Sequence, residues 1–119
     1  MAASWVMPVA EEPPRVAVAV DKEAFTYELI ESYGEFTVNV CGSEKLDLLY
    51  TLGTSSGRSV DKVKALGLPV RKGVKVDAPV LADAIGVLEC TVSGKLESED
   101  TTLLVGDVVY VEVSEELFD

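Results

Sequence analysis

Short valine-rich segments, each bounded by turn residues, are the feature that most restricts what this chain can fold into. Val16–Val20 is an unbroken apolar run that follows two prolines, and such a run is typical of a strand buried on both faces. Residues 35–41 alternate instead, so that Phe36, Val38 and Val40 share one side of an expected strand. Both patterns predict β structure.

Two longer β segments follow, at residues 84–96 and 103–113. Gly94 and Asp100 are turn-forming residues, which predicts that the two segments pair as a hairpin. In the first segment the apolar residues fall on one side of the strand and the polar residues on the other. The apolar side holds Ala84, Leu88, Cys90 and Val92, and the polar side holds Glu89, Thr91, Ser93 and Lys95.

Three short helices are expected between the strands, at 27–32, 44–52 and 60–66. Each has a hydroxyl residue that can cap its start and a glycine close to its end. The expected caps are Thr26, Ser43 and Ser59, and the glycines are Gly34, Gly53 and Gly67. None of these helices is long enough to connect the parallel strands of a doubly wound sheet comfortably. The sequence therefore predicts one mainly β domain over residues 1–119, an antiparallel barrel with short helical inserts.

The composition excludes several kinds of function. The 119 residues include 10 Lys and Arg against 21 Asp and Glu, a net charge of −11, which is unsuited to binding nucleic acid through its phosphates. The absence of His excludes Ser-His-Asp and Cys-His nucleophiles and His-ligated metals. If the chain is an enzyme, we expect no catalytic side chain, no metal, and a cofactor that carries the reaction.

Cysteine usage and hydropathy point to the cytoplasm. Cys41 and Cys90 are the only cysteines and lie 49 positions apart, so a disulfide framework or a Cys-x-x-Cys site is excluded. We expect both to be reduced and buried. No apolar run reaches the ~18 residues of a membrane helix, and the N-terminus lacks a secretory pattern. A cytoplasmic protein without a membrane partner is the expectation.

The richest local chemistry lies where residues 53–58, Gly-Thr-Ser-Ser-Gly-Arg, lead into the helix expected at 60–66. Backbone N–H groups at a helix start attract anions. Ser56 supplies a hydroxyl group, and Gly57 lets a ligand approach the backbone closely. Arg58 and Lys62 supply two positive charges. A terminal phosphate would suit this segment, although it is not a P-loop. The same residues also fit an ordinary capped helix in which Arg58 pairs with Asp61 or Glu44.

A second candidate is the N-terminal segment Ala2-Ala3-Ser4-Trp5. Small residues beside a hydroxyl and an aromatic ring let a flat ligand ring lie against the main chain. The alternative is the start of a strand whose Trp5 packs in the core.

These segments occur among motifs that together resemble the flavin reductase-like FMN-binding proteins, of the flavoredoxin and archaeal ferric reductase type. The matching pieces run through nearly the whole chain in the family's order. They are residues 2–5 (Ala-Ala-Ser-Trp), 8–9, 13–14, 16–20, 27–40 (ending Gly-Glu-Phe-Thr-Val-Asn-Val), 56–58 (Ser-Gly-Arg), 61–62, 67–68, 78–81 (Ala-Pro-Val-Leu), 88–90 (Leu-Glu-Cys) and 106–108.

The resemblance implies a split β-barrel of Greek-key type that binds FMN without a covalent link, usually as a homodimer with the flavin near the interface. It implies that Ala3 and Ser4 face the isoalloxazine, with Ala2 and Trp5 close by. Ser56, Gly57, Arg58 and Lys62 would hold the phosphate. NAD(P)H is the implied reductant, with free flavin, ferric iron or a redox partner as acceptor. The limited basic surface favours NADH.

The chain also departs from the family pattern. Met1 almost coincides with the first motif, so the usual first strand is expected to be missing, and Ala2 replaces the usual Thr. No His stands on the penultimate hairpin, where Asp100-Thr101-Thr102 lies, and the chain stops at Asp119. Two further readings therefore stay open: an FMN-binding electron carrier without nicotinamide activity, and a non-catalytic flavin-binding scaffold.

Overall fold

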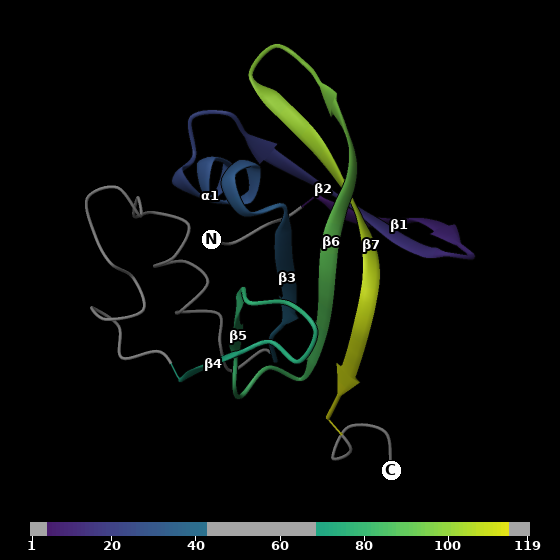
Figure 1. Cartoon of the computed structure of the whole chain (residues 1–119), viewed down its shortest axis with the longest axis vertical. Coiled ribbons are helices and arrows are strands. Elements are labelled where there is room, and N and C mark those ends of the chain that lie inside the picture. The colour runs from purple at the N-terminus through teal and green to yellow at the C-terminus, as the bar shows by residue number, and fades with distance from the viewer. Residues whose placement is uncertain (1–4, 43–68, 115–119) are drawn as a thin grey trace.

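The computed structural model describes residues 5–42 and 69–114 as a mainly antiparallel β structure with one helix (Figure 1). Five strands form a sheet in the order β1-β2-β7-β6-β3, and β4 and β5 form a separate two-stranded ladder. The elements are β1 (Val6–Glu11), β2 (Pro14–Asp21), α1 (Phe25–Tyr33), β3 (Glu35–Val40), β4 (Val70–Lys72), β5 (Pro79–Leu81), β6 (Gly86–Glu97) and β7 (Thr101–Val113). The predicted fold class is confirmed, and the sheet formed by the described strands is open rather than closed into a barrel.

The predicted C-terminal hairpin is confirmed, and it is the central unit of the sheet. At its tip the backbone N–H of Ser98 donates to the carbonyl of Thr101 at 2.8 Å. The pairing of β6 with β7 shifts by one residue at two places, between Glu89 and Cys90 and between Val92 and Gly94. Such bulges increase the local twist, so the hairpin bends around the core instead of lying flat.

The hydrophobic core lies between the sheet and α1. The valine run of β2 supplies much of it, and Ala17 on the opposite face is fully buried as well, which confirms burial on both sides. The cluster consists of Val16, Val18, Val20, Ile30, Phe36, Cys90 and Leu104. Gly106 gives the Phe36 ring room to enter, because a Cβ at this position would lie 2.6 Å from Phe36 Cζ.

The first predicted helix is present, but its predicted start is wrong. The helix begins at Phe25 after Ala24, which makes no side-chain capping bond, so Thr26 lies within the first turn. Gly34 ends the helix as predicted, with a φ of 69° and its N–H donated to the carbonyl of Ile30 at 2.8 Å. The helices expected at 44–52 and 60–66 lie outside the described residues.

Two strands, β4 and β5, were not expected from the pattern, whereas β1 is the strand that the alternative reading of residues 2–5 allowed. The short ladder of β4 and β5 lies against the polar side of β3. Two side chains of β3 form hydrogen bonds with backbone groups of β5. Thr37 donates its hydroxyl to the carbonyl of Pro79 at 2.7 Å, and Asn39 accepts the N–H of Leu81 at 3.0 Å. The sheet therefore carries α1 on one face and the β4–β5 ladder on the other.

Neither cysteine forms a disulfide, and Cys90 is buried while Cys41 is half-buried. Within residues 5–42 and 69–114, α1 is the one helix, and it is too short and polar to span a bilayer.

Candidate functional site

Most of the predicted flavin site falls on residues that the structure does not describe. Ala2, Ala3 and Ser4 at the N-terminus lie outside the described ranges, as do the phosphate candidates Ser56, Gly57, Arg58 and Lys62. The pairing of Arg58 with Asp61 or Glu44 falls outside them too. Trp5 is therefore the candidate whose position can be examined.

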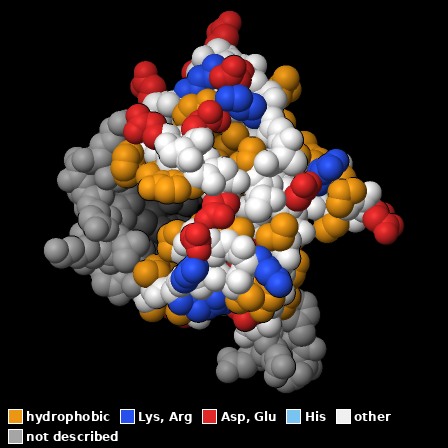
Figure 2. All heavy atoms as spheres, viewed as in Figure 1, with side chains coloured by type: hydrophobic (Ala, Val, Ile, Leu, Met, Phe, Trp, Pro, Cys, Tyr) orange, Lys and Arg blue, Asp and Glu red, His pale blue; other side chains and the backbone are white. Residues whose placement is uncertain are grey.

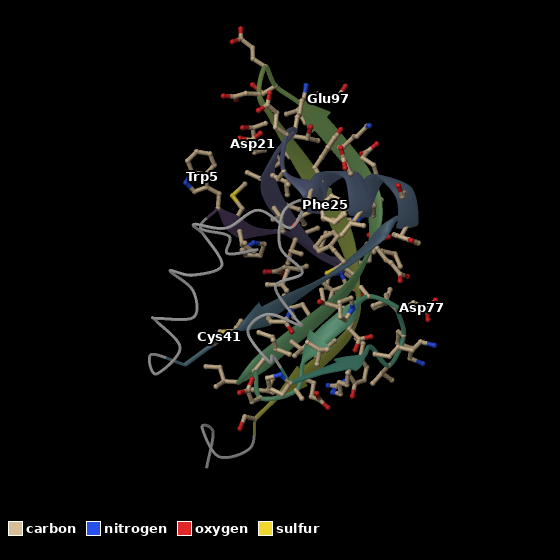
Figure 3. All side chains as sticks on the ribbon, turned by 90° about the vertical axis from the view of Figure 1, so that its left-hand side faces the viewer. Trp5, Asp21, Phe25, Cys41, Asp77 and Glu97 are labelled. Atoms are coloured by element: carbon tan, nitrogen blue, oxygen red, sulfur yellow. The ribbon has the colours of Figure 1, made fainter. Side chains whose placement is uncertain are left out.

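Trp5 stands at the start of β1 with its ring exposed. Its residue surface is 71% accessible, and Figure 3 shows the indole projecting away from the ribbon. The alternative that Trp5 packs in the core is thus wrong, because β1 is an outer strand of the sheet and its own side chains are exposed. The backbone is nevertheless fixed, since the carbonyl of Trp5 accepts the N–H of Ala19 at 3.1 Å. An exposed ring on a fixed backbone fits the role of a neighbour to a flat ligand.

The most elaborate polar arrangement among the described residues surrounds Glu89, which the sequence pattern placed on a polar strand face. Glu89 is fully buried. Its carboxylate accepts the backbone N–H groups of three consecutive residues: Val74 at 2.9 Å, Lys75 at 2.7 Å and Val76 at 3.2 Å. The next N–H, that of Asp77, is donated to Glu35 at 2.7 Å. Two carboxylates on neighbouring strands therefore hold the whole turn after β4.

Glu89 is an anchor rather than an acid–base group. Burial by itself raises the pKa of Glu89, but the three N–H donors and the nearby Arg71 guanidinium outweigh it and hold the pKa below its ordinary value. The carboxylate is therefore ionised at neutral pH and engaged with the turn. The sequence signal for this role was a lone carboxylate between Leu88 and Cys90 in an otherwise apolar stretch.

A cluster of three cations was not singled out in the sequence: Arg71 and Lys72 lie in β4, and Lys75 lies in the turn after it. Figure 2 shows Lys and Arg side chains gathered with acidic ones at the lower end of the visible face. Arg71 pairs with Glu112, and Lys72 pairs with Asp77 at 2.8 Å. With Glu89 and Glu35 also at this turn, the positive charges are offset, and the cluster is unsuited to holding a phosphate.

The Cys90 thiol is also unsuited to catalysis. Burial raises the pKa of the Cys90 thiol to about 11, with smaller contributions from the carboxylates of Asp107 and Glu89. A protonated, buried thiol is a poor nucleophile. Across residues 5–42 and 69–114, no group of three or more His, Cys, Asp and Glu side chains could hold a metal ion.

Comparison with known proteins identifies relatives along the whole chain. Residues 1–119 match the flavin reductase like domain. The uncharacterized Escherichia coli (strain K12) protein YddH is 38% identical over 111 residues, which are 92% of this chain and 59% of that protein. Flavoredoxin of Desulfovibrio vulgaris (Miyazaki F) superposes with a TM-score of 0.90 at 30% identity, covering 98% of this chain and 62% of its own.

A third similar protein is an FMN-binding protein from Thermus thermophilus, solved with bound p-hydroxybenzaldehyde. It gives a TM-score of 0.89 at 30% identity and covers 98% of this chain and 64% of its own. The chain thus spans about three fifths of the length of these relatives. Because the family match covers every residue and the folds superpose, the chain belongs to the flavin reductase-like domain family.

Proposed function

We propose that the chain binds FMN non-covalently and works, as a homodimer in the cytoplasm, as an oxidoreductase between NAD(P)H and an electron acceptor. The observation that carries the proposal is the superposition with flavoredoxin over 98% of the chain at a TM-score of 0.90. The FMN-binding protein from Thermus thermophilus, at 0.89, supports FMN as the particular flavin. Free flavin, ferric iron or a redox partner are the acceptor classes that the proposal allows.

The proposed site uses two segments of the chain. Ala2, Ala3, Ser4 and Trp5 would lie along the flat ring, with small side chains that allow main-chain N–H groups to approach it. Ser56, Gly57, Arg58 and Lys62 would hold the phosphate through a hydroxyl, backbone N–H groups and two positive charges. The exposure of the Trp5 ring, at 71%, is compatible with this placement.

The side chains that are present indicate which part of the reaction FMN would perform and which part the protein would perform. FMN, when bound, supplies the hydride and electron transfer that side chains cannot perform. The protein would position the donor over the ring and exclude competing contacts, which is where the rate acceleration would arise. Glu89 and Cys90 take no part, because one is an engaged anchor and the other a buried thiol.

A second candidate is an FMN-binding electron carrier that does not use nicotinamide. It is favoured by the similarity to a protein named flavoredoxin. A scaffold that binds flavin without turnover is the limiting case of this candidate.

The test is a titration of the purified protein with FMN, followed by anaerobic mixing with NADH and, separately, NADPH. A stoichiometric flavin spectrum that bleaches at turnover rates supports the oxidoreductase. A flavin spectrum that neither nucleotide changes, while dithionite still reduces it, supports the carrier. A chain that does not retain or bind FMN contradicts both.

A further inference from the structure

The segment that carries the proposed phosphate residues has both of its ends tied to the same part of the described chain. The chain leaves β3 after Val40 and enters β4 at Val70. At the first end, the N–H of Leu81 is donated to Oδ1 of Asn39 at 3.0 Å, and the N–H of Ile85 is donated to the carbonyl of Val40 at 2.8 Å. At the second end, Val70 pairs with Leu81. The two ends of the β5–β6 connection therefore hold the exit and the return close together.

The return end belongs to a strap, defined here as residues 69–82, which comprises β4, β5 and the turn between them. Figure 1 shows these two strands beside the lower part of β3. The strap contains two buried valines, Val76 and Val80, and Val87 of β6 is buried as well, but none of the three belongs to the main core cluster. Three small side chains bury little apolar area. Hydrogen bonds therefore contribute much of what holds the strap on the sheet.

Glu89 is the centre of these hydrogen bonds. Its buried carboxylate accepts the three consecutive N–H groups of residues 74–76, and bonds to a charged acceptor are stronger than bonds between neutral groups. Glu35 and Thr37 of β3 bind the backbone further along the strap, at 2.7 Å each. If the turn lifted, the carboxylate would lose all its donors at once and remain as a buried, unpaired charge. The strap therefore docks and lifts as one unit.

We infer that Glu89 is a positioning residue for the proposed FMN site: it holds the strap on the sheet and so fixes where residues 43–68 return to it, without touching FMN. The proposed phosphate residues belong to this segment, and Lys62 stands seven positions before Pro69. Seven residues span at most about 25 Å when fully extended, so a docked strap restricts where Lys62 can lie. The inference rests on the proposed function and adds a residue outside the two segments that would contact the flavin.

The size of the effect depends on how often the strap is docked. When only a fraction of the molecules can bind a ligand, the apparent dissociation constant rises by the inverse of that fraction. A variant whose strap is docked in about one molecule in ten would therefore bind FMN about tenfold more weakly. Because linkage is reciprocal, FMN must favour the docked strap over the lifted one by the same factor.

The first experiment measures the FMN dissociation constant by fluorescence titration, with circular dichroism to verify that each variant is folded. Glu89→Ala should raise the constant at least tenfold, and Glu89→Gln, which keeps one acceptor oxygen, should raise it less. Ile30→Val is the matched control, because it removes one carbon from the core beneath α1 and lowers stability without touching the strap. Its FMN dissociation constant should stay unchanged.

Asn39→Ala keeps the test decisive if Glu89→Ala does not fold. This variant removes the acceptor of the Leu81 N–H at the other end of the strap and should also weaken FMN binding. Folded Glu89→Gln and Asn39→Ala proteins that both keep the natural dissociation constant overturn the inference. An equal loss of affinity in Ile30→Val overturns it as well, because lower stability and not the position of the strap would then be the cause.

The second experiment measures amide hydrogen exchange of the natural protein with and without saturating FMN. FMN should slow exchange at residues 74–76 more than at Gly34, whose N–H closes the end of α1 on the other face of the sheet. In Glu89→Ala, residues 74–76 should exchange rapidly in the absence of FMN. Exchange at these residues that FMN leaves unchanged in the natural protein contradicts the coupling.

The outcomes separate this inference from the proposed function. A natural protein that does not bind FMN overturns both. A natural protein that binds FMN, with folded Glu89 variants that bind it equally well, overturns the inference alone and leaves the flavin function standing.

Discussion

Gly73 lies so close to Glu89 that a Cβ at Gly73 would be 2.8 Å from Oε1 of the buried carboxylate and 2.6 Å from the carbonyl oxygen of Val76. The absence of a side chain at Gly73 therefore lets the turn after β4 fold onto Glu89. Because this contact joins residues 16 positions apart, it fixes the β4–β5 ladder against the sheet.

Gly73→Ala should destabilise the protein by about 1–3 kcal/mol, because backbone and a buried carboxylate would have to move. The control is Gly94→Ala, since a Cβ at Gly94 meets nothing within 4 Å. It should change the free energy of unfolding by less than about 0.5 kcal/mol. Urea denaturation of both variants measures the difference, and equal effects would contradict the role of Gly73.

Glu89→Ala should lower the free energy of unfolding by about 2–4 kcal/mol, because it leaves the three N–H groups of residues 74–76 without their acceptor. Glu89→Gln keeps one acceptor oxygen and should cost less. Glu99→Ala, at an exposed position of the hairpin tip, serves as the control and should be close to neutral. Amide hydrogen exchange provides the local readout: residues 74–76 should lose protection in Glu89→Ala. Unchanged protection there would show that the carboxylate does not hold the turn.

Stability at acid pH should depend on Glu89. The pKa of this carboxyl is lower in the folded chain than its ordinary value of 4.5, so the unfolded chain takes up the proton first. The contribution of Glu89 is therefore fully present above about pH 4.5 and is lost as the pH falls through the folded-state pKa. The free energy of unfolding should fall less steeply below this pH in Glu89→Gln than in the natural protein. If the free energy of unfolding depends on pH equally in both proteins, Glu89 is not the group responsible.

Gly106 and Phe36 should show strong energetic coupling. Gly106→Ala places a Cβ 2.6 Å from Phe36 Cζ and 2.9 Å from Cys90 Cβ. It should therefore lower the free energy of unfolding by about 1–3 kcal/mol. In a Phe36→Leu background the same substitution should cost less, because the smaller side chain leaves room. A double-mutant cycle measured by urea denaturation tests this, and additive effects would count against direct contact.

Lys62→Glu should weaken FMN binding at least tenfold, equivalent to about 1.4 kcal/mol, because it places a negative charge beside the proposed phosphate. The matched control is Lys75→Glu, which makes the same charge change at an exposed position outside the proposed site. Fluorescence titration with FMN gives both dissociation constants. If both variants lose affinity equally, net charge is the cause and Lys62 is not at the phosphate.

Local patterns predicted the parts of the fold that depend on neighbouring residues. The Val16–Val20 strand, the stop at Gly34 and the C-terminal hairpin each follow from side-chain alternation or turn chemistry. Thr26 failed as a cap because the chain enters α1 from a turn in which Asp21 accepts the N–H of Glu23 at 2.8 Å, so the helix begins at Phe25 without a side-chain cap.

Contacts between distant residues could not be inferred in this way. Glu89 was placed on a polar strand face because alternation records which side a residue faces and not what covers that side. β4 and β5, which cover it, are three residues each and too short to produce a pattern. The placement of Trp5 in the core failed because burial depends on a second layer over β1. Whether Ser56, Gly57, Arg58 and Lys62 come together around a phosphate stays a prediction.

The two bulges of the β6–β7 hairpin compensate each other. Ser93 is the extra residue on β6 and Val109 the extra residue on β7, so both ends of the hairpin keep the same register and only the stretch between them is offset. The hairpin is thereby divided into an upper half that supports α1 and a lower half that supports the β4–β5 ladder on the opposite face. Halves that carry separate layers need not open together. We therefore expect the end of the hairpin that carries the ladder to exchange its amide protons by local opening, while the end that carries α1 stays closed.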